Sequence, residues 1–332
     1  MRPTVLVTAT EHAKGAAVYG AMDDLAIHSV PADEPAVAEA ITRLGCHTVV
    51  LGASRYEGPV YQALANAAAG RGALIARFGV GHDGIDKPLA RSLGITVTNT
   101  PGTLDASVAE LTWWLIGSLV RHVATVHGRF VGGAWSGITG SEVHGRTLGL
   151  VGCGPIAQRV ASIASNGFGM RVIACSRRPT SEIEAAYGRS ISAMGIARHT
   201  QDLNALLAES DLVSLHLPAT PETRHLFDAA RLARLRPGAL FINTGRGVLV
   251  DEIALYRALA SGALAGAALD VFEREPYVPA DPAHDLRTLA NVVLTPHIGS
   301  NTTQANGRMA AGTLANVRAF LSGRHGDLNR VG

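Results

Sequence analysis

The chain has 332 residues, which is enough for two domains of ordinary size, each with its own core. Hydrophobic residues make up 47% and charged residues 17% of the chain, a composition that is typical of a well-buried globular protein and excludes a largely disordered one. The formal net charge of +2 is small and unclustered, so it gives no reason to expect a nucleic-acid or membrane partner.

The cysteines and the most apolar segments limit the possible compartments. Cys46, Cys153 and Cys175 lie far apart and have neither metal-ligand spacing nor the spacing of a disulfide framework, so we expect a cytoplasmic protein without a metal site. The N-terminal apolar run is too short for a signal peptide, and the apolar helix expected around Leu111 to Val120 is too short to span a bilayer.

In the first third of the chain, short strands alternate with helices. Strands are expected at Thr4–Thr8, Leu25–Val30, Thr48–Leu51, Leu74–Arg77 and Thr96–Asn99, with helices at Glu34–Leu44 and Gly58–Ala69. Strands separated by helices of this length predict βαβ units and a parallel sheet. The turn Thr100-Pro101-Gly102 ends this pattern, and one long helix is then expected from about Asp105 to Val126, with a composition suited to crossing between domains.

A second alternation follows and ends in one amphipathic helix, Thr302 to Leu321. Its strands are expected at Thr147–Val151, Arg171–Cys175, Leu212–Leu215, Ala239–Asn243, Gly266–Leu269 and Val292–Leu294. We infer that the last helix packs back on the first domain, which then consists of residues 1–103 plus 300–332, and that the second domain spans residues 104–299. The predicted fold class is α/β, with two doubly wound parallel-sheet (Rossmann/flavodoxin-like) domains and an interdomain cleft that takes a ligand.

The most informative segment is the glycine turn after the strand Thr147–Val151. Gly152 permits a tight turn, Gly154 lets the backbone approach a pyrophosphate, and the helix that begins near Pro155 and Ile156 directs its free N–H groups at the phosphates. Because the turn lies between a buried-strand run and a helical run, it predicts a dinucleotide site. The domain of residues 104–299 is therefore expected to bind the dinucleotide, and the other domain to bind the substrate.

The tip of the next strand bears on the choice of dinucleotide. An NAD site usually has an acidic residue about 20 positions after the glycine turn, to bind the ribose 2′-hydroxyl. Here Ser176, Arg177 and Arg178 occupy that place, and the first carboxylate is Glu182. Because the planar fork of arginine matches phosphate oxygens, this tip predicts a preference for NADP(H), with NAD(H) possible and a solvated basic turn as the alternative interpretation.

Three more motifs follow strands of the second domain. Arg246 lies in a glycine-flanked loop, Asp270 and Glu275 follow the next strand, and His297 comes shortly before Gly299. The carboxyl ends of the strands meet at one crevice in an open α/β sheet, so these loops can share a site. Arginine clamps a carboxylate and polarises a carbonyl, and histidine exchanges a proton near neutral pH. The remaining histidines have no convincing ligand spacing, so no metal is expected.

These motifs, with the glycine turn and the split first domain, resemble the D-isomer-specific 2-hydroxyacid dehydrogenase family over nearly the whole chain. The resemblance implies a catalytic set of Arg246, Glu275 and His297. Arg246 is implied to bind the substrate carboxylate and keto oxygen, His297 to protonate that oxygen as hydride arrives, and Glu275 to pair with His297. Asp270 matches the position that hydrogen-bonds the nicotinamide end.

The resemblance extends to the rest of the site. The segment from Arg77 to Asp86 resembles the substrate loop of the family, whose backbone amides, here at Val80 and Gly81, hold the carboxylate. Further positions implied to line the cofactor are Leu217, Pro218, Thr223, Thr244, Gly245 and Gly299. The family's usual arrangement is a homodimer through the long helix near Leu111.

The sequence thus predicts NADPH-dependent reduction of a small 2-keto acid, with glyoxylate and hydroxypyruvate as leading substrates, to the D-2-hydroxy acid. Two alternatives remain open. Arg77, as a second cation, suits a D-3-phosphoglycerate-type or phosphonate-bearing substrate, although a structural role for it is equally compatible with the sequence. A non-catalytic dinucleotide-sensing protein, similar to the C-terminal-binding-protein corepressors, would keep the same three catalytic residue types.

Overall fold

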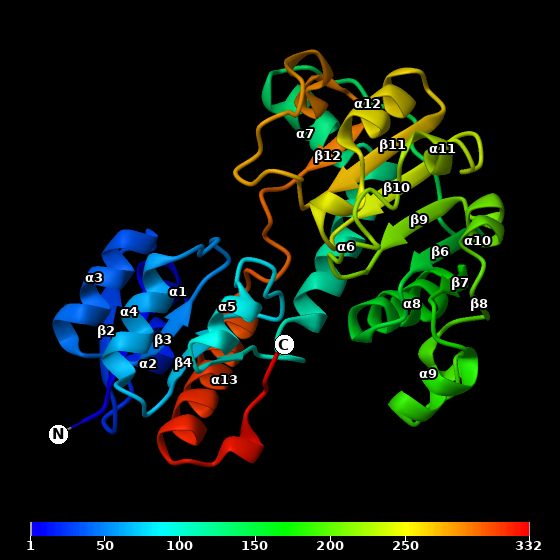
Figure 1. The fold of residues 1–332 in the computed structure, drawn as a ribbon. Coiled ribbons are helices and arrows are strands. Elements are labelled where there is room, and N and C mark those ends of the chain that lie inside the picture. The colour runs from blue at the N-terminus through cyan, green and yellow to red at the C-terminus, as the bar shows by residue number, and fades with distance from the viewer. Residues whose placement is uncertain (1, 332) are drawn as a thin grey trace. The chain divides into compact units, whose positions relative to one another are not determined.

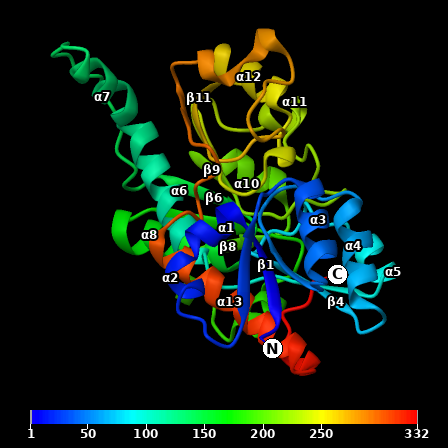
Figure 2. The ribbon, with the colours of Figure 1, turned by 90° about the vertical axis from the view of Figure 1, so that its left-hand side faces the viewer.

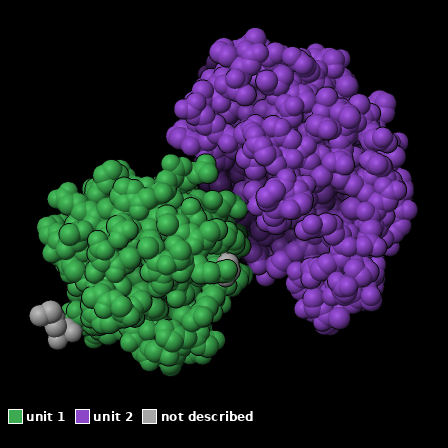
Figure 3. Space-filling model, in the orientation of Figure 1, with its two compact units in different colours: residues 1–104, 300–332 green, residues 105–299 purple. Residues whose placement is uncertain are grey.

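The structure is a computed structural model that describes residues 2–331. It divides into two compact units: unit 1 comprises residues 1–104 and 300–332, and unit 2 comprises residues 105–299. Figure 3 colours the two units separately. Within the described residues, no helix is long and apolar enough to cross a membrane.

Unit 1 is built on a five-stranded parallel sheet with the strand order β2-β1-β3-β4-β5. Its elements are β1 (Thr4–Thr8), α1 (Ala9–Lys14), α2 (Ala16–Tyr19), β2 (Ala26–Val30), α3 (Glu34–Leu44), β3 (Thr48–Leu51), α4 (Pro59–Ala68), β4 (Ala73–Arg77), α5 (Lys87–Ser92), β5 (Ile95–Thr98), α13 (Thr303–Leu321) and the 3-10 helix η5 (His325–Asp327). Helices α3, α4 and α5 pack into one core with the sheet. On the other side, α13 contacts α1, α2 and β4, so the C-terminal helix packs against the sheet formed by the N-terminal segment (Figure 1).

Unit 2 is a seven-stranded parallel sheet with the strand order β12-β11-β10-β9-β6-β7-β8. Its helices and strands are α6 (Asp105–Val120), α7 (Val123–Val131), β6 (Thr147–Val151), α8 (Pro155–Phe168), β7 (Arg171–Cys175), α9 (Thr180–Tyr187), β8 (Arg198–Thr200), α10 (Leu203–Glu209), β9 (Leu212–Leu215), α11 (Ala229–Leu232), β10 (Ala239–Asn243), α12 (Glu252–Ala260), β11 (Leu264–Leu269) and β12 (Val292–Leu294). Its 3-10 helices are η1 (Ser192–Met194), η2 (Gly247–Leu249), η3 (Pro282–His284) and η4 (Leu286–Thr288).

Two separate cores lie on the faces of this second sheet. One contains apolar side chains of α6, α8 and α9, and the other contains those of α10, α11 and α12. A near-continuous apolar run such as Leu148–Val151 predicts a strand whose side chains are buried on both faces of the sheet, and the structure has this arrangement. The parallel, doubly wound α/β class expected from the sequence is confirmed.

One expected helix and one unexpected strand mark where the structure departs from the elements predicted from the sequence. The prediction of a single helix from Asp105 to Val126 is wrong, because His122 adopts a left-handed backbone (φ 55°) and separates α6 from α7. The Val120 carbonyl, which a continuing helix would use, accepts instead from the Ser141 N–H (2.9 Å). The edge strand β8 was not expected, since its three residues are polar and show no apolar alternation. Helix α7 extends away from the sheet of unit 2 (Figure 2).

Candidate active site

The glycine turn after β6 has the geometry of an anion-binding turn. Gly152 has a φ of +114°, and a Cβ there would lie 2.4 Å from the His216 carbonyl oxygen, so glycine is required at this position. Gly154 is the N-cap of α8, and a Cβ there would meet nothing within 4 Å. No side chain caps α8, whose first residues, Pro155 and Ile156, follow directly. The turn therefore offers uncapped helix N–H groups beside open space, which fits a dinucleotide pyrophosphate.

The segment after β7 is held by polar contacts. The Ser176 hydroxyl lies 3.0 Å from Nε2 of His199, and Gln201 donates to the Arg177 carbonyl (2.6 Å). The Arg178 guanidinium lies over the Tyr187 ring, 5.8 Å from its centroid.

The charges of both arginines act on groups bordering the glycine turn and the loop after β9. Burial raises the pKa of the Cys153 thiol in the glycine turn, and the charge of Arg178 opposes that rise. The pKa of Glu222 is lowered by hydrogen bonds from Thr220 and from its own N–H, and further by the charge of Arg177. Because β6 and β7 are parallel neighbours, the two arginines follow the same end of the sheet as the glycine turn.

The loop after β10 is folded around the side chain of Asn243. This buried amide accepts from the Gly245 N–H (3.0 Å) and donates to the Arg246 carbonyl (2.9 Å). The Arg246 guanidinium donates to the Gly245 carbonyl (2.7 Å). The preceding residue, Thr244, is buried, and its hydroxyl lies 2.9 Å from that of Thr112 on α6. Arg246 thus stands on a loop whose backbone is fixed by its own strand end.

Gly247 lets two loops of the site approach each other closely. A Cβ on Gly247 would lie 1.8 Å from the Phe272 carbonyl carbon and 2.4 Å from the Glu273 nitrogen, which no side chain can occupy. The buried carboxylate of Glu252 accepts from the Glu273 N–H (2.7 Å) and holds the second loop from behind. The Arg246 loop is therefore packed backbone to backbone against the loop that carries Glu275.

Glu275 and His297 form a direct pair. Oε2 of Glu275 lies 2.6 Å from Nδ1 of His297, and Oε1 accepts from the Phe272 N–H (3.0 Å). Burial alone raises the pKa of Glu275, but the hydrogen bond and charge of His297, the Phe272 N–H and the charge of Arg246 outweigh it and hold the pKa below its ordinary value. The side chains of His297 and Glu275 are 40% and 36% exposed, so the pair is within reach of a ligand. All three residues expected to be catalytic therefore lie close together.

Asp270 clamps the loop that carries His297. Oδ1 accepts from the Thr295 hydroxyl (2.6 Å) and the Ile298 N–H (2.9 Å), and Oδ2 accepts from the Gly299 N–H (2.8 Å). Asp270 is buried, and this desolvation raises its pKa despite the three donors. His297 itself has a positive φ of 52°, a conformation rare outside glycine, so the clamp holds the backbone where the ring faces Glu275. Nothing in the sequence indicates this second role for Asp270.

The other expected cofactor positions lie on the loop after β9. The Thr223 hydroxyl accepts from the Thr220 N–H (2.8 Å) and lies 2.9 Å from the Pro218 carbonyl, which closes the loop on itself. Leu217 is partly buried against the core that contains α10, α11 and α12.

Unit 1 carries the expected substrate loop. Gly79 has a φ of +127°, and its N–H donates to the Thr100 hydroxyl (3.1 Å), while the Asn99 amide donates to the Val80 carbonyl (2.8 Å). These bonds fix the backbone that leads through Val80 to Gly81. The Arg77 guanidinium is directed at backbone carbonyls, those of Phe78 and Leu51.

Three residues at this end of unit 2 were not expected from the sequence to belong to the site: Gly247, Glu252 and His199. The signal for Gly247 was its place in the Gly-Arg-Gly segment. Glu252 and His199 gave no local signal, because their partners lie on loops distant in the chain. Within the described residues, no group of three or more His, Cys, Asp or Glu side chains could hold a metal ion.

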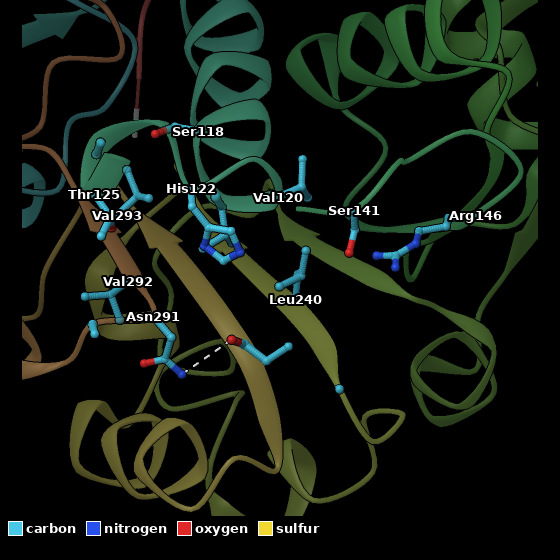
Figure 4. Close-up of a pocket in the computed structure, with 15 residues that line it drawn as sticks. Ser118, Val120, His122, Thr125, Ser141, Arg146, Leu240, Asn291, Val292 and Val293 are labelled. Carbon is cyan, nitrogen blue, oxygen red and sulfur yellow. Dashed lines mark hydrogen bonds between the residues drawn. The ribbon is translucent and has the colours of Figure 1, made fainter. Parts of the chain in front are cut away.

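A cavity of about 130 Å³ lies at the opposite, amino-terminal edge of β10, β11 and β12, among residues that include His122, Ser141, Arg146 and Asn291 (Figure 4). Because the glycine turn and the Arg246, Glu275 and His297 loops all follow the carboxyl ends of their strands, this cavity is separate from the candidate active site.

Comparison with known proteins places this geometry in context. The family model described as "D-isomer specific 2-hydroxyacid dehydrogenase, NAD binding domain" matches residues 113–299. A glyoxylate reductase from Aeropyrum pernix is 42% identical over 260 residues, which cover 76% of this chain and 74% of that protein.

Two crystal structures extend the similarity to the whole chain. A protein from Thermus thermophilus is similar with a TM-score of 0.81 and 34% identity, over 99% of this chain and 100% of that one. The NADPH-dependent glyoxylate/hydroxypyruvate reductase from Sinorhizobium meliloti, in complex with NADP and malonate, is similar with a TM-score of 0.80 and 28% identity, over 97% and 94% of the two chains.

Proposed function

Since the chain belongs to the D-isomer specific 2-hydroxyacid dehydrogenase family, an oxidoreductase family that binds a nicotinamide dinucleotide, we propose that it reduces a small 2-keto acid to the D-2-hydroxy acid with NADPH. The observation that carries the proposal is the 2.6 Å contact between His297 and Glu275, with the charge of Arg246 acting on the same carboxylate. This arrangement provides a cation for an anionic substrate and a proton donor beside it.

Each of the three side chains has one part in the proposed reaction. A nicotinamide dinucleotide bound in unit 2 would supply the hydride. Arg246 binds the substrate carboxylate and polarises the keto oxygen. Glu275, whose pKa is held below its ordinary value, is charged at neutral pH and accepts from Nδ1 of His297, which orients the ring. Nε2 of His297 then gives its proton to the keto oxygen, which becomes the hydroxyl of the product.

We assign the dinucleotide to unit 2 and the substrate carboxylate to the backbone amides of Val80 and Gly81 in unit 1. Gly152, Gly154 and the uncapped start of α8 fit a pyrophosphate. Thr244, Gly245, Asp270 and Gly299 are the residues proposed for the nicotinamide end. Leu217, Pro218 and Thr223 are those proposed for the adenosine and phosphate region.

The names of the relatives guide the choice of substrates. The Aeropyrum protein is a glyoxylate reductase and the Sinorhizobium protein a glyoxylate/hydroxypyruvate reductase, which supports these two keto acids as first candidates. The reductase names of the relatives also favour an enzyme over a dinucleotide sensor. The substrates to test are therefore glyoxylate, hydroxypyruvate, pyruvate and phosphohydroxypyruvate. A higher rate with phosphohydroxypyruvate than with hydroxypyruvate would indicate that Arg77 binds a second anionic group.

The preference for NADPH is tested by replacing both arginines at the tip of β7. We expect Arg177→Ala with Arg178→Ala to lower kcat/KM for NADPH about 10²- to 10⁴-fold, because two charge-assisted bonds to a phosphate together contribute about 3–6 kcal/mol. The value for NADH should change little, since its 2′-hydroxyl has no charge for them to bind. Initial rates with both dinucleotides and saturating glyoxylate measure this. Wild-type turnover with NADH alone would show that the two arginines are solvated.

We also propose a homodimer, supported by an apolar patch on unit 2. This α7 patch consists of Phe130 and Val131 on α7, Trp135 after it and Trp114 on the preceding α6, which are 58%, 70%, 91% and 75% exposed, and the Phe130 and Trp135 rings lie 5.7 Å apart. Large apolar side chains exposed to this degree mark an interaction site, and a second copy of the chain is the partner that the family's usual arrangement implies.

The dimer is tested by light scattering on the purified chain. We expect a mass twice the 34.5 kDa of one chain, falling to one chain when Phe130 and Trp135 are both replaced by serine, because the patch loses the two exposed rings that contact each other. Unfolding monitored by circular dichroism controls for damage to the fold. A wild-type mass of one chain at micromolar concentration would exclude the dimer.

A further inference from the structure

Strand β8 places His199 next to the segment that follows β7. β8 is the edge strand of the sheet and pairs in parallel with β7, with His199 opposite Ala174 and Thr200 opposite Cys175. This register places the His199 side chain next to the residues that leave β7. His199 is half-buried, whereas most of the segment above it is exposed.

The imidazole of His199 joins the two ends of this segment. Its Nε2 lies 3.0 Å from the Ser176 hydroxyl, directly after β7, and its Nδ1 lies 3.0 Å from the Thr180 hydroxyl, the first residue of α9. Arg177 and Arg178 stand between these two attachment points. Both ring nitrogens are therefore used, and both hold the segment that carries the two cations.

The ring is suited to this bridging role when it is neutral. Burial lowers the pKa of His199, so the imidazole carries one N–H donor and one free nitrogen acceptor at neutral pH. It can therefore donate to one hydroxyl and accept from the other. The Ser176 hydroxyl also donates to the Arg178 carbonyl (3.3 Å), so the ring, the hydroxyl and the backbone of the segment are linked in one chain of hydrogen bonds.

We propose that His199 is a positioning residue for NADP recognition, which holds the Ser176 hydroxyl and the Arg177–Arg178 segment in the arrangement that binds a 2′-phosphate. This inference rests on the proposed NADPH preference and adds a residue that touches no phosphate itself. Its effect is confined to the dinucleotide that carries the phosphate. Loss of His199 should therefore weaken NADPH and leave NADH nearly unchanged.

Two substitutions separate the two ends of the bridge. The side-chain amide of glutamine reaches the place of Nε2, so His199→Gln keeps a partner for Ser176, whereas the shorter His199→Asn reaches only the place of Nδ1 and keeps a partner for Thr180. We expect His199→Asn to raise the Kd of NADPH about 10-fold, and His199→Gln to raise it no more than about 2-fold. His199→Leu, which keeps neither bond, should match or exceed the effect of His199→Asn.

The experiment is a titration of the purified full chain with NADPH and with NADH, followed by cofactor fluorescence, for the wild type and the three His199 variants. A change in the ratio of the two Kd values that follows the order Leu, Asn, Gln supports the inference. Equal weakening of both dinucleotides in all three variants would mean a general structural role and overturns it, as does an unchanged ratio.

The Arg177→Ala, Arg178→Ala variant distinguishes this failure from failure of the proposed NADPH preference. If that variant changes the ratio and the His199 variants do not, only the role of His199 is wrong. If the wild type binds the two dinucleotides equally and the arginine variant leaves the ratio unchanged, the NADPH preference and the role of His199 are both wrong.

Discussion

Replacing His297 with alanine is expected to lower kcat for keto-acid reduction about 10²-fold or more, with little change in the Kd of NADPH. The imidazole is the proposed proton donor, and a positioned general acid contributes about 10²- to 10⁴-fold to a rate. Stopped-flow reduction of glyoxylate and a separate dinucleotide titration measure the two quantities. Full activity in the variant would remove His297 from the mechanism.

The pH dependence tests the partnership with Glu275. Reduction needs protonated His297 and should fall as pH rises, whereas oxidation of the hydroxy acid needs the neutral ring and should fall as pH drops. Glu275→Gln keeps the size of the side chain but removes the carboxylate that holds Nδ1 of His297 at 2.6 Å, so kcat should fall in both directions because the ring is no longer oriented. If both directions titrated alike, or if Glu275→Gln kept full activity, the assigned roles would be wrong.

Replacing Gly247 with alanine is expected to lower the free energy of unfolding by about 3 kcal/mol, at the upper end for overpacking. The new Cβ would lie 1.8 Å from the Phe272 carbonyl carbon. This carbon is a backbone atom, so it cannot move aside by a side-chain rotation. For a unit of this size the melting temperature should fall by roughly 10 °C. Activity should fall further than the folded fraction, since the clash separates the loop of Arg246 from that of Glu275.

The matched control is Gly154→Ala. A Cβ at Gly154 meets nothing within 4 Å and the residue has an ordinary extended backbone, so the melting temperature of the free protein should stay within about 1 °C of wild type. The methyl group enters the space proposed for the pyrophosphate, and the Kd of NADPH should rise. Thermal unfolding without and with dinucleotide reads both effects. Equal stability of the Gly247→Ala and Gly154→Ala proteins would contradict the packing argument.

The sequence predicted most strands because their signals are local. Runs such as Thr147–Val151 and Ala239–Asn243 are buried on both faces, and in both cases the expected bounds are those of the structure. The edge strand β8 escaped prediction because a strand with one neighbour needs no apolar pattern. The break at His122 escaped prediction because it depends on a distant contact, the Ser141 N–H on the Val120 carbonyl.

The same distinction applies to the site. The glycine turn, Arg246, Glu275 and His297 each stand in a short recognisable motif, and their common position follows from the rule for strand ends. What holds them in place is not local. The Asp270 carboxylate reaches N–H groups 28 and 29 residues away, and His199 reaches Ser176 across 23 residues. Such contacts form only in the folded chain and leave no signal in the local sequence.

The strands β10, β11 and β12 are immediate neighbours, and the loops after them carry Arg246, Glu275 and His297 in that order. Neighbouring strands lie about 4.8 Å apart, a spacing fixed by backbone hydrogen bonds. The cation, the carboxylate and the proton donor are therefore spaced by the sheet itself, before any substrate arrives. Their arrangement therefore needs no assembly step in each catalytic cycle, and substrate binding does not have to order the three loops.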